Sequence, residues 1–304
     1  MLYRFKRKAE TAWFRFTTQN VFNTAPLVCV SGGGAIIVSQ VCHRDLAMYL
    51  VAVKSFGQYV RPNKVVVLDD TSLTQTDTET LRDHIHTVEI IPITAVNNDK
   101  CPKGGCWERL LFISDIVPSS YVIQVDSDTL TVKVPSVIGD HIKRNASFTL
   151  GEWRGQNIVY AREAADLVRQ EVEAGNAHVQ MISESNLHRL VYDHDLKYVR
   201  GSAGFAGFAK GSFSRSAVER FSHGMANLIG EKKWSDWGSE QVTSNFIVAN
   251  SQEAQVLPFP EYCFHSPGTD VESATFVHFI GSHRFHGGRY ARLARQVILQ
   301  LHQA

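Results

Sequence analysis

The sequence is short of cysteine, has almost no net charge and contains no long hydrophobic run. Its five cysteines are an odd number spread over 304 residues, whereas a secreted disulfide scaffold is denser in cysteine and usually has an even count. We therefore expect reduced thiols and a cytoplasmic location. The net charge of +1 lacks the basic surplus with which nucleic-acid-binding proteins neutralise phosphates, so we expect no nucleic-acid partner.

The sequence also lacks a membrane span, a secretory signal and internal repeats. The longest apolar candidate, residues 26–41, is too short to cross a bilayer and is interrupted by three glycines at 32–34. No linker rich in Pro, Gly or Ser divides the chain. One globular domain is therefore the simplest organisation for this length.

Residues 1–16 differ from the rest of the chain because they are both basic and aromatic. The residues concerned are Leu2, Tyr3, Arg4, Phe5, Lys6, Arg7, Lys8, Trp13, Phe14, Arg15 and Phe16. Two interpretations stay open. The segment is either a helix that rests on an anionic membrane surface, which predicts peripheral contact with the inner face of a membrane, or a helix that packs on the domain with its basic face in solvent.

Strand-like and helix-like segments alternate along the chain, which predicts an α/β fold with a central, mainly parallel sheet flanked by helices. Strands are expected at 35–41, 64–68, 87–93, 120–125, 148–150, 205–209 and 274–279. Helices are expected at 46–56, 105–117, 161–174, 214–229, 239–249 and 289–301.

Two of the expected strands end in carboxylates. Asp69 and Asp70 follow one strand, and Asp126 and Asp128 follow another; ligands of open α/β sheets bind beyond such strand ends. Residues two apart in an extended segment point to the same side, so the side chains of Asp126 and Asp128 are expected to converge. Two carboxylates this close repel each other unless a cation or a proton lies between them. Oxygen ligands suit Mg²⁺ or Mn²⁺, and the alternative is a polar turn.

His278 lies near the end of the expected strand at 274–279. A neutral imidazole is a suitable third ligand for Mn²⁺ beside two carboxylates. An ordinary core or surface histidine is the alternative, because the chain contains 13 histidines.

These motifs resemble the GT-A fold glycosyltransferases, and most closely the glycogenin and galactosyltransferase group called family 8. That family has a D-x-D after a central strand and a C-terminal H-x-x-G-x-x-K-P-W element. This sequence has Asp126-x-Asp128 and His278-x-x-Gly281-x-x-Arg284, with Arg in place of Lys and without the Pro-Trp. The resemblance implies that the two aspartates and the histidine hold Mn²⁺ (or Mg²⁺), that Arg284 contacts the diphosphate of a donor, and that Gly281 is a further donor-binding residue.

Two further segments resemble transferase motifs. Glu240-Gln241-Val242-Thr243-Ser244-Asn245 is similar to the family 8 element D-Q-D-x-x-N, except at Val242. This likeness makes Glu240 either a general base or a group that positions the acceptor, and the start of a helix is the alternative. Asp69-Asp70-Thr71-Ser72 is similar to the D-D-x-S segment of family 2, where an aspartate contacts the nucleoside; a strand-to-turn exit is the alternative.

The glycine-rich stretch 201–208 does not follow the phosphate-loop pattern. It resembles the strand of small residues that lines the donor-sugar pocket of GT-A enzymes, which implies a donor contact at Gly204; a tightly packed strand is the alternative. Arg109, on the expected helix 105–117, is a candidate contact for the donor by its position.

The resemblance implies transfer of a sugar from a nucleotide-sugar donor, expected to be a UDP-sugar, to a hydroxyl acceptor. The acceptor is a glycan, a lipid-linked molecule or a small molecule, such as a precursor of a bacterial surface glycan. The family 8 features favour retention of anomeric configuration, whereas Asp69 and Asp70 favour inversion; we expect retention. We assign 1–30 to an N-terminal segment and 31–304 to one domain. Within that domain, 35–130 form a nucleotide-binding half, 131–288 an acceptor half and 289–304 a C-terminal helix.

Two rival functions stay open. A nucleotidyltransferase that forms sugar nucleotides also uses a metal and an α/β sheet, but the first strand lacks the glycine-rich, basic signature of such enzymes. A non-catalytic protein that binds nucleotides or carbohydrates on the same fold is the second rival. The departures from the family motif at Val242 and after Arg284 are compatible with it.

Overall fold

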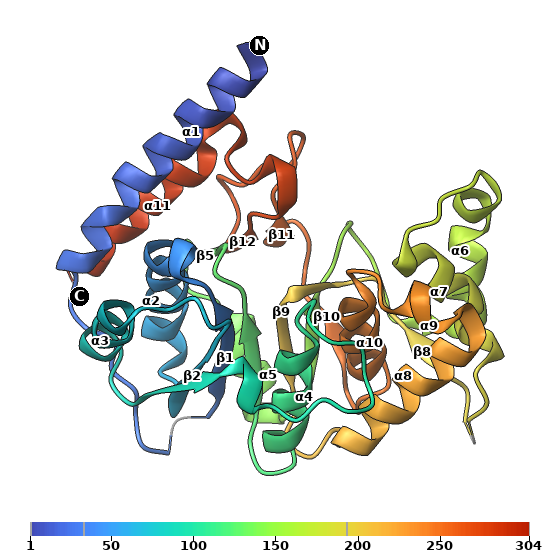
Figure 1. Ribbon diagram of the computed structural model, residues 1–304. Coiled ribbons are helices and arrows are strands. Elements are labelled where there is room, and N and C mark those ends of the chain that lie inside the picture. The colour runs from blue at the N-terminus through green and yellow to red at the C-terminus, as the bar shows by residue number, and fades with distance from the viewer. Residues whose placement is uncertain (1, 33, 193, 304) are drawn as a thin grey trace.

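The computed structural model describes residues 2–32, 34–192 and 194–303, which form a central sheet with helices on both faces (Figure 1). The sheet has seven strands in the order β10-β6-β9-β4-β1-β2-β3. Strands β1, β2, β3 and β4 are mutually parallel, and β9 runs antiparallel to its neighbours β4 and β6. The mainly parallel α/β fold predicted from the sequence is confirmed.

The strands fall into three sheets. The large sheet contains β1 (Ile36–Val41), β2 (Lys64–Asp69), β3 (Val88–Pro92), β4 (Val122–Val125), β6 (Phe148–Leu150), β9 (Ser202–Phe208) and β10 (Gln255–Val256). A smaller sheet contains β5 (Thr129–Thr131), β11 (Tyr262–Phe264) and β12 (Phe276–His278), and β7 (Val159–Tyr160) pairs with β8 (Lys197–Tyr198). The strands expected from the sequence are all present, β6 with the expected ends and the others with shifted ends. Strands β5, β7, β8, β10 and β11 were not expected.

Apolar side chains on the two faces of the large sheet form two separate buried clusters. Ile37 on β1 belongs to the first cluster, and Ile36 and Val38 belong to the second, as expected for a strand buried on both faces. The first cluster includes residues of α1 (Leu2–Thr18), α2 (Leu46–Val60), α3 (Gln75–His84), α5 (Ser136–Arg144) and α11 (Arg289–Leu301). The second includes residues of α4 (Trp107–Ile116), α6 (Ala161–Glu173), α7 (Val179–Asn186), α8 (Arg215–Ile229), α9 (Glu231–Trp234) and α10 (Ser239–Ala249).

Helix α1 lies alongside α11, and the pair forms one end of the molecule in Figure 1. Phe14 is buried between the two helices and contacts the rings of Phe285 and Tyr290. The basic N-terminal segment is therefore a helix packed on the domain. Trp13 and Phe16 nevertheless keep 45% and 79% of their surface in solvent, so membrane contact stays a prediction. The side chains of residues 1–5, on which part of it rests, lie outside the described residues.

Four helices, α3, α5, α7 and the short α9, were not expected from the sequence. In α3, Leu81 is the one buried apolar residue, so the helical hydrophobic pattern is absent. The start of α3 is set by a capping box instead, in which Thr74 and Asp77 each accept a hydrogen bond from the other's backbone N–H.

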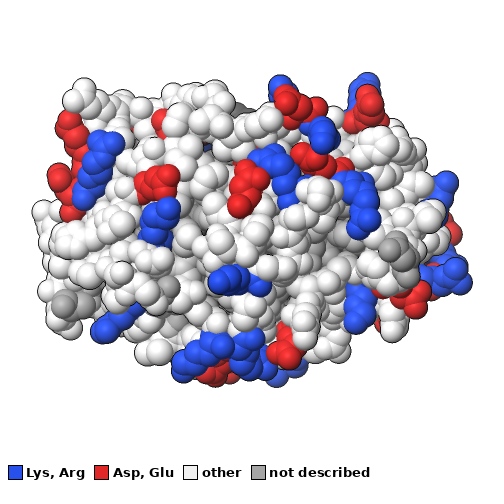
Figure 2. Space-filling model, turned by 90° about the horizontal axis from the view of Figure 1, so that it is seen from below, with Lys and Arg blue, Asp and Glu red and all other residues white. Residues whose placement is uncertain are grey.

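Lysine and arginine side chains are interspersed with acidic ones on the face of the molecule that Figure 2 shows, which is the lower face in Figure 1.

Within the described residues, none of the helices combines the length and the apolar character that a bilayer crossing requires.

Candidate functional site

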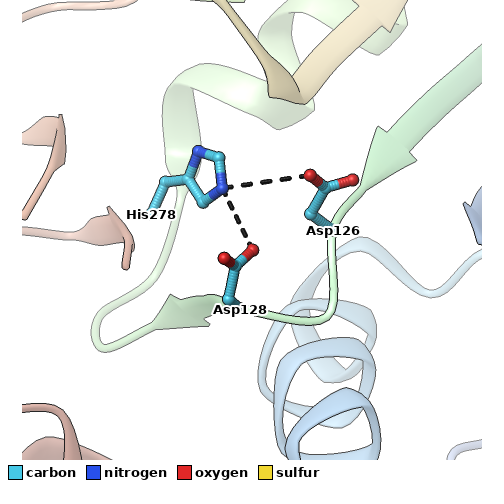
Figure 3. A group of neighbouring side chains, drawn as sticks. All are labelled: Asp126, Asp128 and His278. Atoms are coloured by element: carbon cyan, nitrogen blue, oxygen red, sulfur yellow. Dashed lines mark hydrogen bonds and ion pairs between the residues drawn. The ribbon is translucent and has the colours of Figure 1, made fainter. Parts of the chain in front are cut away.

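Asp126, Asp128 and His278 meet beyond the carboxyl end of β4 (Figure 3). The turn from β4 to β5 carries both aspartates. Strand β12 pairs antiparallel with β5 in a register that sets His278 opposite Thr129, and the backbone N–H of Phe279 donates to the carbonyl of Asp128 at 2.8 Å. Strand pairing therefore brings residue 278 to a turn that lies 150 residues earlier in the chain.

The three side chains form a set of ligands suited to a divalent cation. The Nε2 atom of His278 lies 3.0 Å from Oδ1 of Asp128 and 3.9 Å from Oδ2 of Asp126, and the three ligand atoms lie within 4.8 Å of one another. The other ring nitrogen, Nδ1, is 2.9 Å from the hydroxyl of Ser202, which orients the ring so that Nε2 faces the carboxylates. Two carboxylate oxygens and one imidazole nitrogen fit Mn²⁺ or Mg²⁺.

Each aspartate is also held by an arginine. Arg109 Nη1 donates to Asp126, and Arg284 Nη2 donates to Oδ2 of Asp128 at 2.5 Å. Burial works against ionisation of Asp128, but His278 and Arg284 outweigh it and hold the pKa of this carboxyl below its usual value. Asp128 is therefore an anion at neutral pH, as a cation ligand must be.

Arg109 connects this cluster to Glu240 at the start of α10. The guanidinium of Arg109, on α4, is almost completely buried, and its Nη2 lies 3.6 Å from Oε1 of Glu240. Burial raises the pKa of Glu240 to about 7, although the charge of Arg109 opposes this rise. Glu240 therefore changes its protonation near neutral pH.

Gly204 lies directly beneath the imidazole of His278. Its carbonyl accepts a hydrogen bond from the backbone N–H of Asp126 at 2.9 Å. A Cβ atom at this position would collide with the ring of His278. Close approach of a backbone to a functional side chain is a typical reason for a glycine inside a strand, so in this structure Gly204 supports a predicted metal ligand.

We expect Gly204→Ala to lower the affinity for Mn²⁺ about 10- to 100-fold, the usual range for disturbed support of a metal ligand. The added methyl group displaces the imidazole of His278 from the carboxylates. Titration calorimetry with Mn²⁺ measures the change. Gly139→Ala is the control, because no atom lies within 4 Å of a Cβ built at that position. Equal Mn²⁺ affinity of the two variants would contradict the argument.

A cavity of about 220 Å³ opens in front of the aspartates. Of the residues predicted from the sequence, Asp70, Arg109, Asp126, Asp128 and Arg284 line it. Cys42, Asp45, Met48 and Cys106 also line it and were not anticipated, because nothing in their local sequence distinguishes them from ordinary loop or core residues.

The remaining predicted residues lie around this cavity. Asp69 points into its own turn, where Oδ1 accepts the backbone N–H groups of Thr71 and Leu73. Gly281 begins the short helix η5 (Gly281–His283) with a φ of +58° and lines a neighbouring groove. Glu240 and His278 lie behind residues of the cavity wall.

The first turn of α10 is held by a chain of hydrogen bonds that the sequence did not indicate. Gln241 donates to Gln180 at 3.3 Å, and Gln180 donates to Glu184 at 3.0 Å. Glu184 in turn forms an ion pair with Arg200, with an N–O distance of 2.5 Å. Gln180 and Glu184 belong to α7, whose existence was not predicted. Asn245, the last residue of the α10 motif, donates to the carbonyl of Gly201 at 2.9 Å.

Several solved structures that resemble this one are glycosyltransferases. WbbM, a bifunctional glycosyltransferase, matches with a TM-score of 0.52 and 13% identity over 92% of this chain and 53% of WbbM, so this chain spans about half the length of WbbM. The galactosyltransferase LgtC has a TM-score of 0.41 and 10% identity over 86% of this chain and 95% of its own. Core-mannan synthase A from Aspergillus fumigatus, in an Mn/GDP form, has a TM-score of 0.43 and 10% identity over 88% and 85%. No family model and no curated protein matches the sequence.

Proposed function

We propose that this chain, which has the GT-A glycosyltransferase fold, transfers a sugar from a nucleotide-sugar donor to a hydroxyl acceptor. The observation that carries this proposal is the cluster of Asp126, Asp128 and His278, with Arg284 beside it, at the wall of a cavity beyond the strand ends. An α/β sheet places its ligands at this edge. We also propose that the chain is similar to family 8 in mechanism and that its donor is a UDP-sugar.

The donor diphosphate is proposed to lie between the metal cluster and Arg284. A divalent cation held by Asp126, Asp128 and His278, Mn²⁺ or Mg²⁺, supplies Lewis-acid stabilisation of the leaving diphosphate when bound. Arg284 already donates to Asp128 and reaches the cavity, so its guanidinium is positioned to donate to phosphate oxygens as well. Asp70, at the end of β2, is positioned to accept hydrogen bonds from the nucleoside.

Glu240 is proposed to act on the acceptor side of this site. Its carboxyl lies beside Arg109, which also holds Asp126, so one guanidinium connects Glu240 to the metal ligands. A carboxyl with a pKa of about 7 is suited to accept a proton from an acceptor hydroxyl. The alternative is that Glu240 only positions the acceptor. The class of acceptor, which is a glycan, a lipid-linked molecule or a small molecule, is inferred from the likeness to family 8 alone. The proposal that the anomeric configuration is retained also rests on the likeness to family 8 alone.

If Glu240 is the base, we expect the rate of transfer to rise with pH through about pH 7, where its carboxyl loses the proton. The protonated acid below this pH cannot accept another proton. Glu240→Gln removes the titrating group, so its rate is low and independent of pH around 7. Initial rates measured at a series of pH values test this. A Glu240→Gln variant that keeps the same inflection would show that another group titrates.

The proposed function is tested by incubating the purified protein with Mn²⁺ and a panel of nucleotide sugars while nucleotide and pyrophosphate release are both measured. A transferase releases UDP or another nucleoside diphosphate from the nucleotide sugar. A nucleotidyltransferase forms a nucleotide sugar and pyrophosphate from a nucleoside triphosphate and a sugar 1-phosphate, so pyrophosphate release is measured in parallel mixtures of these two substrates. Thermal unfolding with and without Mn²⁺ identifies the donor, because a ligand that binds the native state raises apparent stability. Binding without any release would support the non-catalytic rival.

A further inference from the structure

A second, larger opening adjoins the donor cavity. It is a groove of about 650 Å³ between α1, the start of α2 and η5. The groove and the donor cavity share Asp45, Met48 and Arg284 as lining residues. Helix α1 lines the groove and contributes nothing to the donor cavity. The groove is thus a distinct space that meets the donor cavity at Arg284.

The lining of this groove contains more basic than acidic side chains. Four arginines and one histidine line it, against the single carboxylate of Asp45; the basic residues are Arg7, Arg15, His43, Arg44 and Arg284. Three of these residues already contact a carboxylate. Arg44 lies 3.3 Å from Asp45, Arg284 lies 2.5 Å from Asp128, and Nδ1 of His43 lies 2.6 Å from Asp77.

Arg7 and Arg15 are different from the other two arginines. Over the part of the chain that the structure describes, no carboxylate lies within ion-pair distance of either. Glu10, on the same helix, accepts the backbone N–H of Gly287 instead. Two guanidinium groups at one groove that form no ion pair among the described residues favour an anionic ligand.

Part of the remaining lining is apolar and indicates what the anion is attached to. Phe14, Ala47, Met48 and Phe285 line the groove together with the arginines. Guanidinium groups bind phosphate oxygens through pairs of hydrogen bonds, and an apolar wall accommodates the carbon part of an ester. Trp13 and Phe16 are exposed on the same helix.

We propose that this groove is a second anion site, which binds the phosphate group of a phosphate ester with an apolar substituent. The ligand is either a lipid whose phosphate lies at a membrane surface or a phosphate ester free in solution. The proposal goes beyond the transfer reaction and does not depend on it, since it rests on the lining of the groove.

The test compares two double variants of the same helix. Arg7→Gln with Arg15→Gln removes the two groove arginines, and Lys6→Gln with Lys8→Gln removes two exposed lysines that do not line the groove. Both variants lose the same charge. Inorganic pyrophosphate is titrated with EDTA present, and binding to phosphatidylcholine vesicles with and without phosphatidic acid is measured by sedimentation. A third titration uses UDP with Mn²⁺.

We expect the arginine variant to bind pyrophosphate at least about tenfold more weakly than the lysine variant, as the loss of charge-assisted hydrogen bonds implies. If it also loses more binding to phosphatidic acid vesicles than the lysine variant, the ligand is a lipid phosphate. If only its pyrophosphate binding falls, the ligand is a free ester. Equal losses in both variants, or no pyrophosphate binding by the unaltered protein, would overturn the site. A matching loss of UDP binding would assign the groove to the donor instead.

Discussion

Asp128→Asn is expected to abolish Mn²⁺-dependent nucleotide binding and to lower the rate of transfer about a thousandfold or more. Asp128 is at once a predicted metal ligand, the hydrogen-bond partner of His278 and the ion-pair partner of Arg284. The amide has almost the same shape but carries no charge, so the remaining ligands hold a divalent cation far less firmly. Calorimetric titration with UDP and Mn²⁺, together with initial rates, measures both effects.

A matched control separates this loss from a change in overall charge. Asp140→Asn alters an exposed aspartate on α5 by the same amide substitution, and we expect it to leave binding and rate unchanged. Thermal unfolding identifies any Asp128→Asn protein that has simply lost its fold. Nucleotide binding by folded Asp128→Asn that equals that of the unaltered protein would rule out the metal site.

Arg109→Met is expected to lower the free energy of unfolding by about 3 to 5 kcal/mol, as removal of one partner from a buried ion pair generally does. The methionine fills part of the space, but Glu240 and Asp126 then lack the guanidinium group of Arg109 that lies between them. Chemical denaturation measures the loss. Arg162→Met, which alters an exposed arginine on α6, is the control with unchanged stability.

The destabilisation by Arg109→Met should also depend on pH. The pKa of Glu240 is already raised to about 7 by burial, and removal of Arg109 raises it further. A group whose pKa is higher in the folded than in the unfolded state stabilises the fold fully at pH values below its unfolded-state pKa. This contribution is lost as pH rises through its folded-state pKa. The variant should therefore lose more stability at alkaline pH than at mildly acidic pH. Adding Glu240→Gln should restore part of it, and a double variant no more stable than Arg109→Met would contradict the role of Glu240.

Local patterns were sufficient to predict the strands of the large sheet other than β10, together with β12 and the position of the aspartates. The β-branched run of β2 and the apolar run of β4 are buried on both faces, and such runs are recognisable without tertiary information. Asp126 and Asp128 directly follow β4, so their convergence depends on the geometry of one turn. The fold class and the candidate ligands were accordingly within reach of the sequence.

Helix α3 shows where hydrophobic patterning fails. It contributes Leu81 to the core, and its other side chains are all polar, with Asp77 the one buried among them. Periodicity detects a helix through its buried face, so a helix that buries so little gives no signal. The capping box of Thr74 and Asp77 was the available local indication. Because α7 was not predicted, the hydrogen bonds through which Gln180 and Glu184 support the first turn of α10 were not predicted either.

The sequence by itself determined the α/β fold, the carboxylates at the ends of β2 and β4 and the basic, aromatic character of the first helix, because each depends on residues close together in the chain. Only the tertiary structure decided that His278 reaches Asp128, that Arg109 connects Asp126 to Glu240, and that Arg7 and Arg15 line a groove next to Arg284. These contacts join distant segments through strand register and helix packing. No short-range pattern encodes such contacts, because their geometry is set by the whole core.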